Sequence, residues 1–201
     1  LFRSHQEGQL VDRLIGEIQG APLLRSELIM ETRIRLLMEG KVNQSLAGLS
    51  PQQLHQGLQA LIRSRVLYGE ALRLQSTQSS QQAVAEALGT IKERFATDQA
   101  FLDVLTRLEL TAEELRDFLR RDLVVQKFRE RSILLNVNIN EKDVETRVNT
   151  HLATHPGEDK SAVEQRVKQA MIEEERTKQA AFYEAQTNER LRQLRSAGKI
   201  R

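Results

Sequence analysis

Cysteine is absent from this chain of 201 residues, which excludes disulfides and thiolate metal sites. Aromatic residues make up only 4% of the chain, so a core has to be built mainly from leucine, isoleucine, valine and alanine. Three prolines and ten glycines leave room for long uninterrupted helices. No stretch approaches the ~20 apolar residues that a membrane-spanning helix needs. We therefore expect a mainly α-helical protein without membrane insertion, built as one domain or as one domain with an extended arm.

The chain also lacks an excess of one charge. It carries 30 basic and 28 acidic residues, and the two kinds are intermixed along the sequence. Glu70 stands between Arg65 and Arg73, and Asp122 directly follows Arg121. Nucleic-acid binding needs a face on which basic side chains are concentrated. We therefore expect no nucleic-acid partner.

Catalytic motifs are missing as well. The glycines stand singly, so there is no phosphate-binding loop, and no nucleophile stands in a Gly-x-Ser-x-Gly context. His151 and His155 are four residues apart, a spacing that puts two imidazoles on one helix face, and Glu158 and Asp159 follow closely. Because no third ligand stands at a motif-defined spacing, solvated histidines are favoured over a metal site. We expect no catalytic residue, no cofactor and no metal.

Helix-start signals occur along most of the chain. Ser50-Pro51-Gln52-Gln53 combines an N-cap serine, a proline at the first helical position and a glutamine at the capping-box position. Thr111 with Glu114, and Ser161 with Glu164, form two further capping boxes. Apolar spacing and caps, including Thr97 and Asn140, predict helices over about 27–39, 51–74, 81–95, 98–108 and 111–131, one from 141, and one of some 34 residues from 161.

Extended segments are few. A β-prone run from Leu14 to Ile18 meets a turn signal at Gly20-Ala21-Pro22 and passes into a helical pattern that Ser26 opens. A lone strand needs a partner for its backbone N–H and C=O groups, and the best candidate is Lys199-Ile200-Arg201. We therefore expect the two ends of the chain to form a small β patch. Elsewhere the composition predicts a Gln/Ser-rich linker over 75–82 and an extended segment over 133–139.

Four longer segments carry a resemblance when they are taken in order. They are VDRLIGEIQGAPLLRSE, LSPQQLHQGLQALIRSRVLYGEALRL, LTAEELRDFLRRDLVVQKFRERSILLNVNINEKDVE and NERLRQLRSAGKIR. This order of strand and turn, second helix, later helix with an extended exit, and final helix and strand resembles the SurA-like family of periplasmic chaperones. The segments cover most of the chain.

One departure from that family concerns its parvulin-type prolyl isomerase domains, which lie between the extended exit and the final helix. Each needs about a hundred residues, whereas only the segment from about Val144 to Ser161 is available here. The resemblance therefore implies a single SurA-like core domain without isomerase activity. Its parts are a strand over 11–19, a helical region over 26–139, a short connection over 140–160, and a long helix with a terminal strand over 161–201.

The resemblance implies an ATP-independent periplasmic holdase in outer-membrane protein biogenesis, which binds unfolded or partly folded envelope polypeptides. Apolar surface between helices would make many weak contacts with extended chains. Candidate client-binding residues are Met30, Met38, Met171, Phe182 and Tyr183. Ordinary core packing is the stronger alternative for the methionines, because spacing alone does not separate a groove from a core.

Two other functions are open at this point. A structural or assembly scaffold would dock one specific partner or form a homodimer through the C-terminal helix, whose Val163 to Met171 end is expected to reach outward or to contact a second copy. A residual prolyl isomerase is the enzyme alternative, and we expect no such activity. The chain begins at Leu1 rather than methionine, which suggests a mature chain, with a signal sequence removed, or a trimmed one; the periplasmic location is implied by the resemblance alone.

Overall fold

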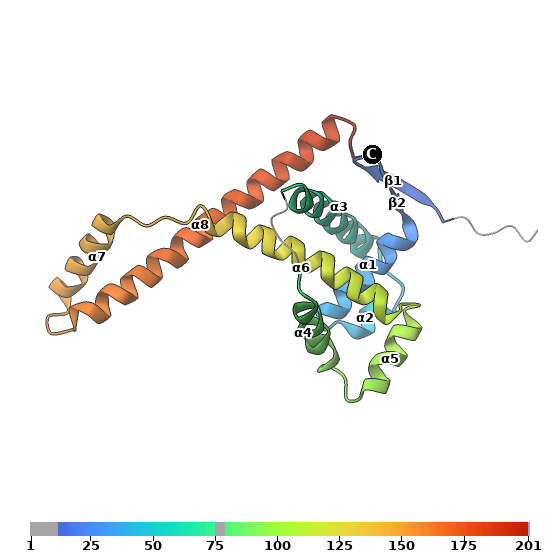
Figure 1. The fold of residues 1–201 in the computed structure, drawn as a ribbon, viewed down its shortest axis with the longest axis horizontal. Helices are drawn as coiled ribbons and strands as arrows, with labels where there is room; N and C mark the ends of the chain where they lie inside the picture. Colours follow the sequence, from blue (N-terminus) through green and yellow to red (C-terminus); the bar gives the residue numbers. More distant parts are fainter. Residues whose placement is uncertain (1–11, 75–78, 201) are drawn as a thin grey trace, which may run out of the picture. The chain divides into compact units, whose positions relative to one another are not determined.

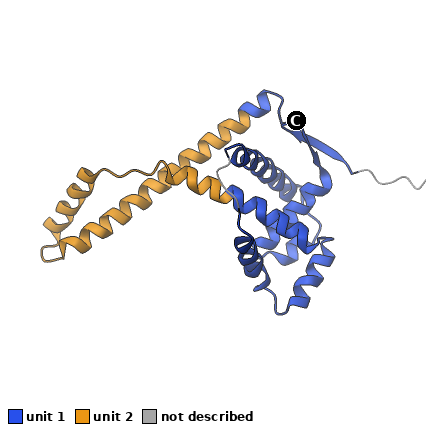
Figure 2. Ribbon diagram, in the orientation of Figure 1, with its two compact units in different colours: residues 1–125, 193–201 blue, residues 126–192 orange. Residues whose placement is uncertain are grey.

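The computed structural model describes residues 12–74 and 79–200, and it confirms the expected mainly α-helical fold with a small β patch and a long C-terminal helix (Figure 1). Clustering of contacts divides the chain into two compact units, which Figure 2 colours separately. Unit 1 contains residues up to 125 together with those from 193 onward, and unit 2 contains residues 126–192. The described elements are β1 (Leu14–Ile18), β2 (Ala21–Leu24), α1 (Arg25–Met38), α2 (Val42–Leu46), α3 (Pro51–Arg73), α4 (Gln81–Lys92), α5 (Asp98–Arg107), α6 (Ala112–Leu134), α7 (Glu141–Thr154) and α8 (Lys160–Ser196).

The main partner of β1 is β2, a strand that the sequence pattern did not predict. The two strands form an antiparallel hairpin whose central residues, Gln19 and Gly20, both have positive φ, as in a type I′ turn. The turn therefore begins one residue earlier than the predicted Gly20-Ala21-Pro22 signal and shares Gly20 with it. Pro22 is accommodated within β2 because the strand lies at an edge of a two-stranded sheet.

The C-terminal tail nevertheless reaches β1, as expected. The backbone N–H of Gln19 donates to the carbonyl oxygen of Lys199 at 2.7 Å, and Ile200 forms an antiparallel bridge with Ile18. Gly198, with a φ of +66°, ends α8 and turns the chain toward the hairpin. The tail thus adds one bridge to a hairpin that supplies most of the pairing. Residues 11 and 201 of the predicted strands lie outside the described residues.

Most of the predicted helix starts are confirmed. Ser50 and Gln53 form the reciprocal capping box at α3, Thr111 and Glu114 form another at α6, and Thr97 caps α5. Asn140 likewise accepts a hydrogen bond from the backbone N–H of Lys142 at the start of α7.

Two predicted starts are wrong. Helix α1 begins at Arg25 rather than at Ser26, and the backbone N–H of Ser26 donates to Oδ1 of Asp12, 14 positions earlier. The side chain of Asp12 therefore caps α1 from before the hairpin. Helix α8 begins at Lys160, because the Asp159 carboxylate accepts from the backbone N–H of Ala162 at 2.8 Å. Ser161, the predicted cap, lies inside the first turn.

Two segments differ from expectation in their secondary structure. Helix α6 continues to Leu134, so the predicted extended segment over 133–139 begins inside a helix and forms no strand among the described residues. The five-residue helix α2 was not predicted; it is too short to leave a clear periodic signal. Part of the predicted linker over 75–82 lies outside the described residues, and α4 begins at Gln81 within it.

The core of unit 1 joins α1, α4, α5 and α6. Phe101 is 1% exposed and meets the ring of Phe95 edge to face, with ring centroids 5.5 Å apart. Helices α1 and α3 approach each other closely at Gly57, which faces Thr32 of α1. The buried residues of this core are Ile34, Leu37, Val84, Leu88, Ile91, Phe101, Val104, Leu105, Leu108, Leu110, Leu115, Phe118 and Leu119.

Unit 2 has a separate, smaller core. Helix α7 lies alongside α8, and Val144, Val148, Val163 and Met171 are buried between them (Figure 1). An ion pair joins Arg147 to Glu174 at 3.0 Å, and another joins Lys168 to Glu141 at 3.4 Å. The segment predicted as a short connection over 140–160 therefore contains one arm of a helical hairpin. Val163 and Met171, which were expected to reach outward or to contact a second copy, pack within the chain.

Candidate client-binding surface

The five predicted client-binding residues lie in two groups. Met30 and Met38 of α1 are partly buried against the core of unit 1. Met171 is 8% exposed in the core of unit 2, and Tyr183 of α8 is half-buried. Phe182, with 59% of its surface exposed, presents the most apolar surface of the five. The three methionines thus fit the core-packing alternative, whereas Phe182 is exposed.

A second exposed apolar surface lies at the C-terminal end of α6. Leu134 and Leu135 are 48% and 74% exposed. They line a shallow hollow of about 320 Å³ together with Lys127, Glu130 and Arg131. A neighbouring hollow of about 490 Å³ extends along α6 and α8 within unit 2; it is lined by Gln126, Arg129, Glu130, Ile133, Arg176 and Ala180.

These leucines were missed because the sequence pattern placed them in an extended segment. One signal was present: Ile133, Leu134 and Leu135 are consecutive apolar residues, and consecutive residues of a helix point about 100° apart. They cannot all face the same partner. In the structure Ile133 is buried, whereas Leu134 and Leu135 are exposed. The surface is mixed in character, because Lys127, Glu130 and Arg131 line it beside the two leucines.

Unit 1 carries further exposed apolar side chains. Leu14 of β1 is 62% exposed, and Leu72 and Leu74 at the end of α3 are 54% and 52% exposed. Leu102 of α5 is 46% exposed. Single exposed leucines are ordinary on protein surfaces. Leu72 and Leu74 differ from single exposed leucines because they lie together at the end of α3.

A buried carboxylate lies on α1 of unit 1. Glu31 is 5% exposed and faces Nη2 of Arg121 at 3.4 Å and Nη2 of Arg35 at 3.8 Å. Arg35 also lies over the ring of Phe118 and 3.8 Å from a carboxylate oxygen of Asp122. Burial raises the pKa of Glu31, and the two arginines offset that effect only in part. The network ties α1 to α6.

The raised pKa of Glu31 leads to a prediction with a definite sign. The folded protein holds the Glu31 proton more tightly than the unfolded chain does. The contribution of Glu31 to the free energy of unfolding therefore falls as pH rises from the unfolded pKa of Glu31 toward its folded pKa. Glu31→Gln removes this dependence, so the variant gains stability relative to the native chain as pH rises from about 4 to about 7, by about 1 kcal/mol. Urea unfolding across this pH range measures the difference.

Glu114→Gln is the matched control, with the opposite sign. Hydrogen bonds from the backbone N–H and the hydroxyl of Thr111 lower the pKa of Glu114. The ionised carboxylate therefore stabilises the folded state above its unfolded pKa, and this contribution is lost as pH falls. The Glu114 variant should lose stability relative to the native chain as pH rises. Parallel curves for the two variants would contradict the assignment of Glu31.

Metal-ligand side chains of the described residues gather at one place, the turn between α7 and α8, where His151, His155 and Glu158 lie together. No helix among the described residues combines the length and the hydropathy needed to cross a bilayer. Comparison of the chain with family models, with curated proteins and with solved structures gave no match. Function has to be argued from the surfaces themselves.

Proposed function

We propose that this protein is an ATP-independent holdase of the cell envelope, which binds unfolded or partly folded polypeptides without isomerase activity. The observation that carries the proposal is the exposed apolar surface formed by Leu134 and Leu135 with its rim of charged side chains. A shallow surface of this kind suits weak contacts with many different extended chains, because it offers apolar area without an enclosed pocket that would select one shape.

Two further features support the same proposal. Phe182 adds a second exposed apolar side chain in unit 2. Helix α8 has 37 residues, and charged residues are spread along it. They confine its exposed apolar area to small patches. The periplasmic location is part of the proposal and depends on the SurA-like resemblance.

Aggregation of an unfolded outer-membrane β-barrel protein, followed by light scattering without nucleotide, tests the proposal. The native chain should suppress aggregation at equimolar concentration. L134S/L135S should weaken client binding about tenfold or more, since each leucine loses about 1 kcal/mol of apolar burial. F182S should act in the same direction, whereas the matched polar double variant N149S/Q169S, on exposed positions of unit 2, should protect like the native chain.

Two outcomes would contradict the holdase. One is an absence of protection by the native chain at equimolar concentration. The other is equal protection by L134S/L135S, F182S and N149S/Q169S. A stable complex of defined stoichiometry with one envelope protein, or a discrete homodimer in light scattering, would favour the scaffold alternative instead. Refolding of a proline-limited substrate should proceed at its uncatalysed rate.

A further inference from the structure

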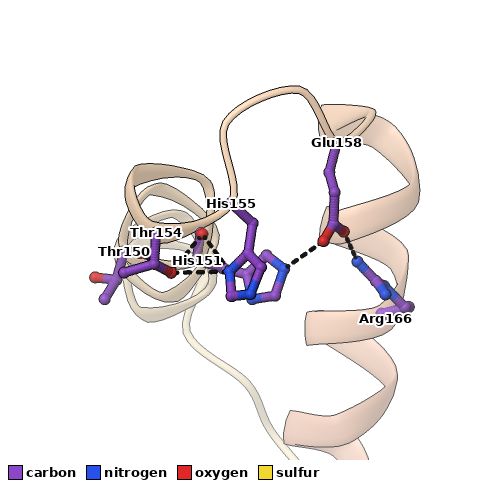
Figure 3. Close-up of polar contacts among 6 residues, drawn as sticks. All are labelled: Thr150, His151, Thr154, His155, Glu158 and Arg166. Atoms are coloured by element: carbon purple, nitrogen blue, oxygen red, sulfur yellow. Dashed lines mark hydrogen bonds and ion pairs between the residues drawn. The ribbon is translucent and has the colours of Figure 1, made fainter.

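The turn between α7 and α8 brings together three side chains that are typical metal ligands. His151 lies in the last turn of α7, His155 directly follows the helix, and Glu158 lies in the turn before α8. Gly157, with a φ of +110°, reverses the chain between the second and third of these residues. One ligand atom from each side chain lies within 4.8 Å of the other two. Figure 3 shows the two imidazoles stacked and facing the carboxylate.

Hydrogen bonds prepare His155 as a ligand. The hydroxyl of Thr154 lies 2.9 Å from the carbonyl oxygen of His151 and 2.9 Å from Nδ1 of His155 (Figure 3). Nδ1 of His155 also lies 3.3 Å from that carbonyl oxygen, which can only accept, and this contact favours the tautomer with the proton on Nδ1 and the lone pair on Nε2. Histidines that bind metals commonly donate their other ring N–H in this way, which fixes the tautomer and the ring orientation.

Two contacts orient Glu158. Its Oε2 pairs with Arg166 of α8, and its Oε1 faces Nε2 of His151 at 3.4 Å (Figure 3). The oxygen that faces the imidazoles is therefore the one that Arg166 leaves available.

We propose that His151, His155 and Glu158 bind a divalent late-transition-metal ion, with Zn²⁺ as the representative. Two imidazole nitrogens and one carboxylate oxygen form a donor set that suits Zn²⁺, Ni²⁺ and Cu²⁺ and does not suit Mg²⁺. Ligand atoms that each lie about 2.0–2.2 Å from one ion are closer to one another than the 4.8 Å limit that these three atoms meet. Binding therefore requires small rotations of the three side chains that bring their ligand atoms together. Water fills the remaining coordination position.

The bound ion would act as a structural clip. It would join the last turn of α7 to the turn that precedes α8, and the ion pair of Glu158 with Arg166 would connect it to α8 itself. The ends of α7 and α8 would then be held together beyond Val148 and Val163, the buried valines nearest to the turn. This inference does not depend on the holdase proposal.

Calorimetric titration of the untagged full chain with Zn²⁺ tests the proposal. We expect one ion per chain at about pH 7.5. His151→Ala and His155→Ala should each abolish binding or weaken it by about a hundredfold, and Glu158→Gln should weaken it by about tenfold or more. Bound Zn²⁺ should also raise the midpoint of thermal unfolding of the native chain. Mg²⁺ at the same concentration should give no saturable binding.

The other two histidines of the chain provide the matched control. The double variant H5A/H55A removes two imidazoles, as H151A/H155A does. H5A/H55A should bind Zn²⁺ like the native chain. Circular dichroism of each variant shows whether the helices are retained. Absence of saturable Zn²⁺, Ni²⁺ and Cu²⁺ binding by the native chain would overturn the proposal. So would undiminished binding by the His151 and His155 variants.

Discussion

Val148→Asp should release α7 from α8 while unit 1 stays folded. Val148 is 2% exposed and lies in the small core of unit 2 with Val144 and Val163. A carboxylate at this position would be buried without a partner, which destabilises by about 3 kcal/mol or more. A core of so few side chains has little stability in reserve, and an isolated helix of 14 residues is marginal in water. Helix α7 should therefore unfold.

Hydrogen exchange followed by mass spectrometry measures this effect by segment. Peptides from α7 should lose their protection, whereas peptides that contain Leu37 and Leu115, which are fully buried in unit 1, should keep theirs. Asn149→Asp, one position away on the exposed face, adds the same charge and should leave α7 protected. Loss of protection throughout both units would show that the two cores do not fold independently.

Gly57→Ala should destabilise the protein even though alanine is the better helix former. A Cβ at Gly57 would overlap the hydroxyl of Thr32 and lie 3.1 Å from both Cβ and Cγ2 of that residue. Thr32 is 5% exposed, and its hydroxyl donates to the carbonyl oxygen of Leu28 at 2.7 Å, so it has little freedom to move. Overpacking should exceed the helix-propensity gain and leave a net loss of about 2 kcal/mol. Urea unfolding measures it.

Gly89→Ala provides the control for the Gly57 variant. Gly89 lies inside α4, and no neighbouring atom lies within 4 Å of a Cβ placed there. This substitution should stabilise the protein by up to about 1 kcal/mol, because only the propensity gain remains. Adding Thr32→Ala to Gly57→Ala should recover part of the loss, since it removes the hydroxyl and the methyl group that clash. A stable Gly57→Ala protein would mean that α1 and α3 do not approach as closely as described.

Helix starts were predictable wherever the capping contact is local. Ser50 with Gln53 and Thr111 with Glu114 each satisfy backbone groups three residues away, so the pattern is contained in a short window of sequence. The start of α1 was not predictable in this way. Its cap is Asp12, which reaches Ser26 only because the intervening hairpin folds back.

The candidate surfaces were less predictable than the helices. Methionine spacing on α1 is the same for a core and for a groove, and the structure packs Met30 and Met38 against the core of unit 1. Leu134 and Leu135 could have been found only from their helical phase, because exposure depends on which faces the neighbouring elements cover. Glu158 was visible beside the two histidines, but its approach to them depends on the reversal of the chain at Gly157.

The sequence by itself determined the helical character, most of the helix starts, the long C-terminal helix and the absence of disulfide and thiolate-metal chemistry. These properties follow from composition and from hydrogen bonds between residues a few positions apart. Only the tertiary structure decided that β1 pairs mainly with β2, that the apolar residues separate into two cores, and that two histidines meet one carboxylate. The separation into two cores depends on contacts between residues far apart in the sequence, whereas the hairpin and the histidine–carboxylate cluster depend on chain reversals at Gln19-Gly20 and at Gly157.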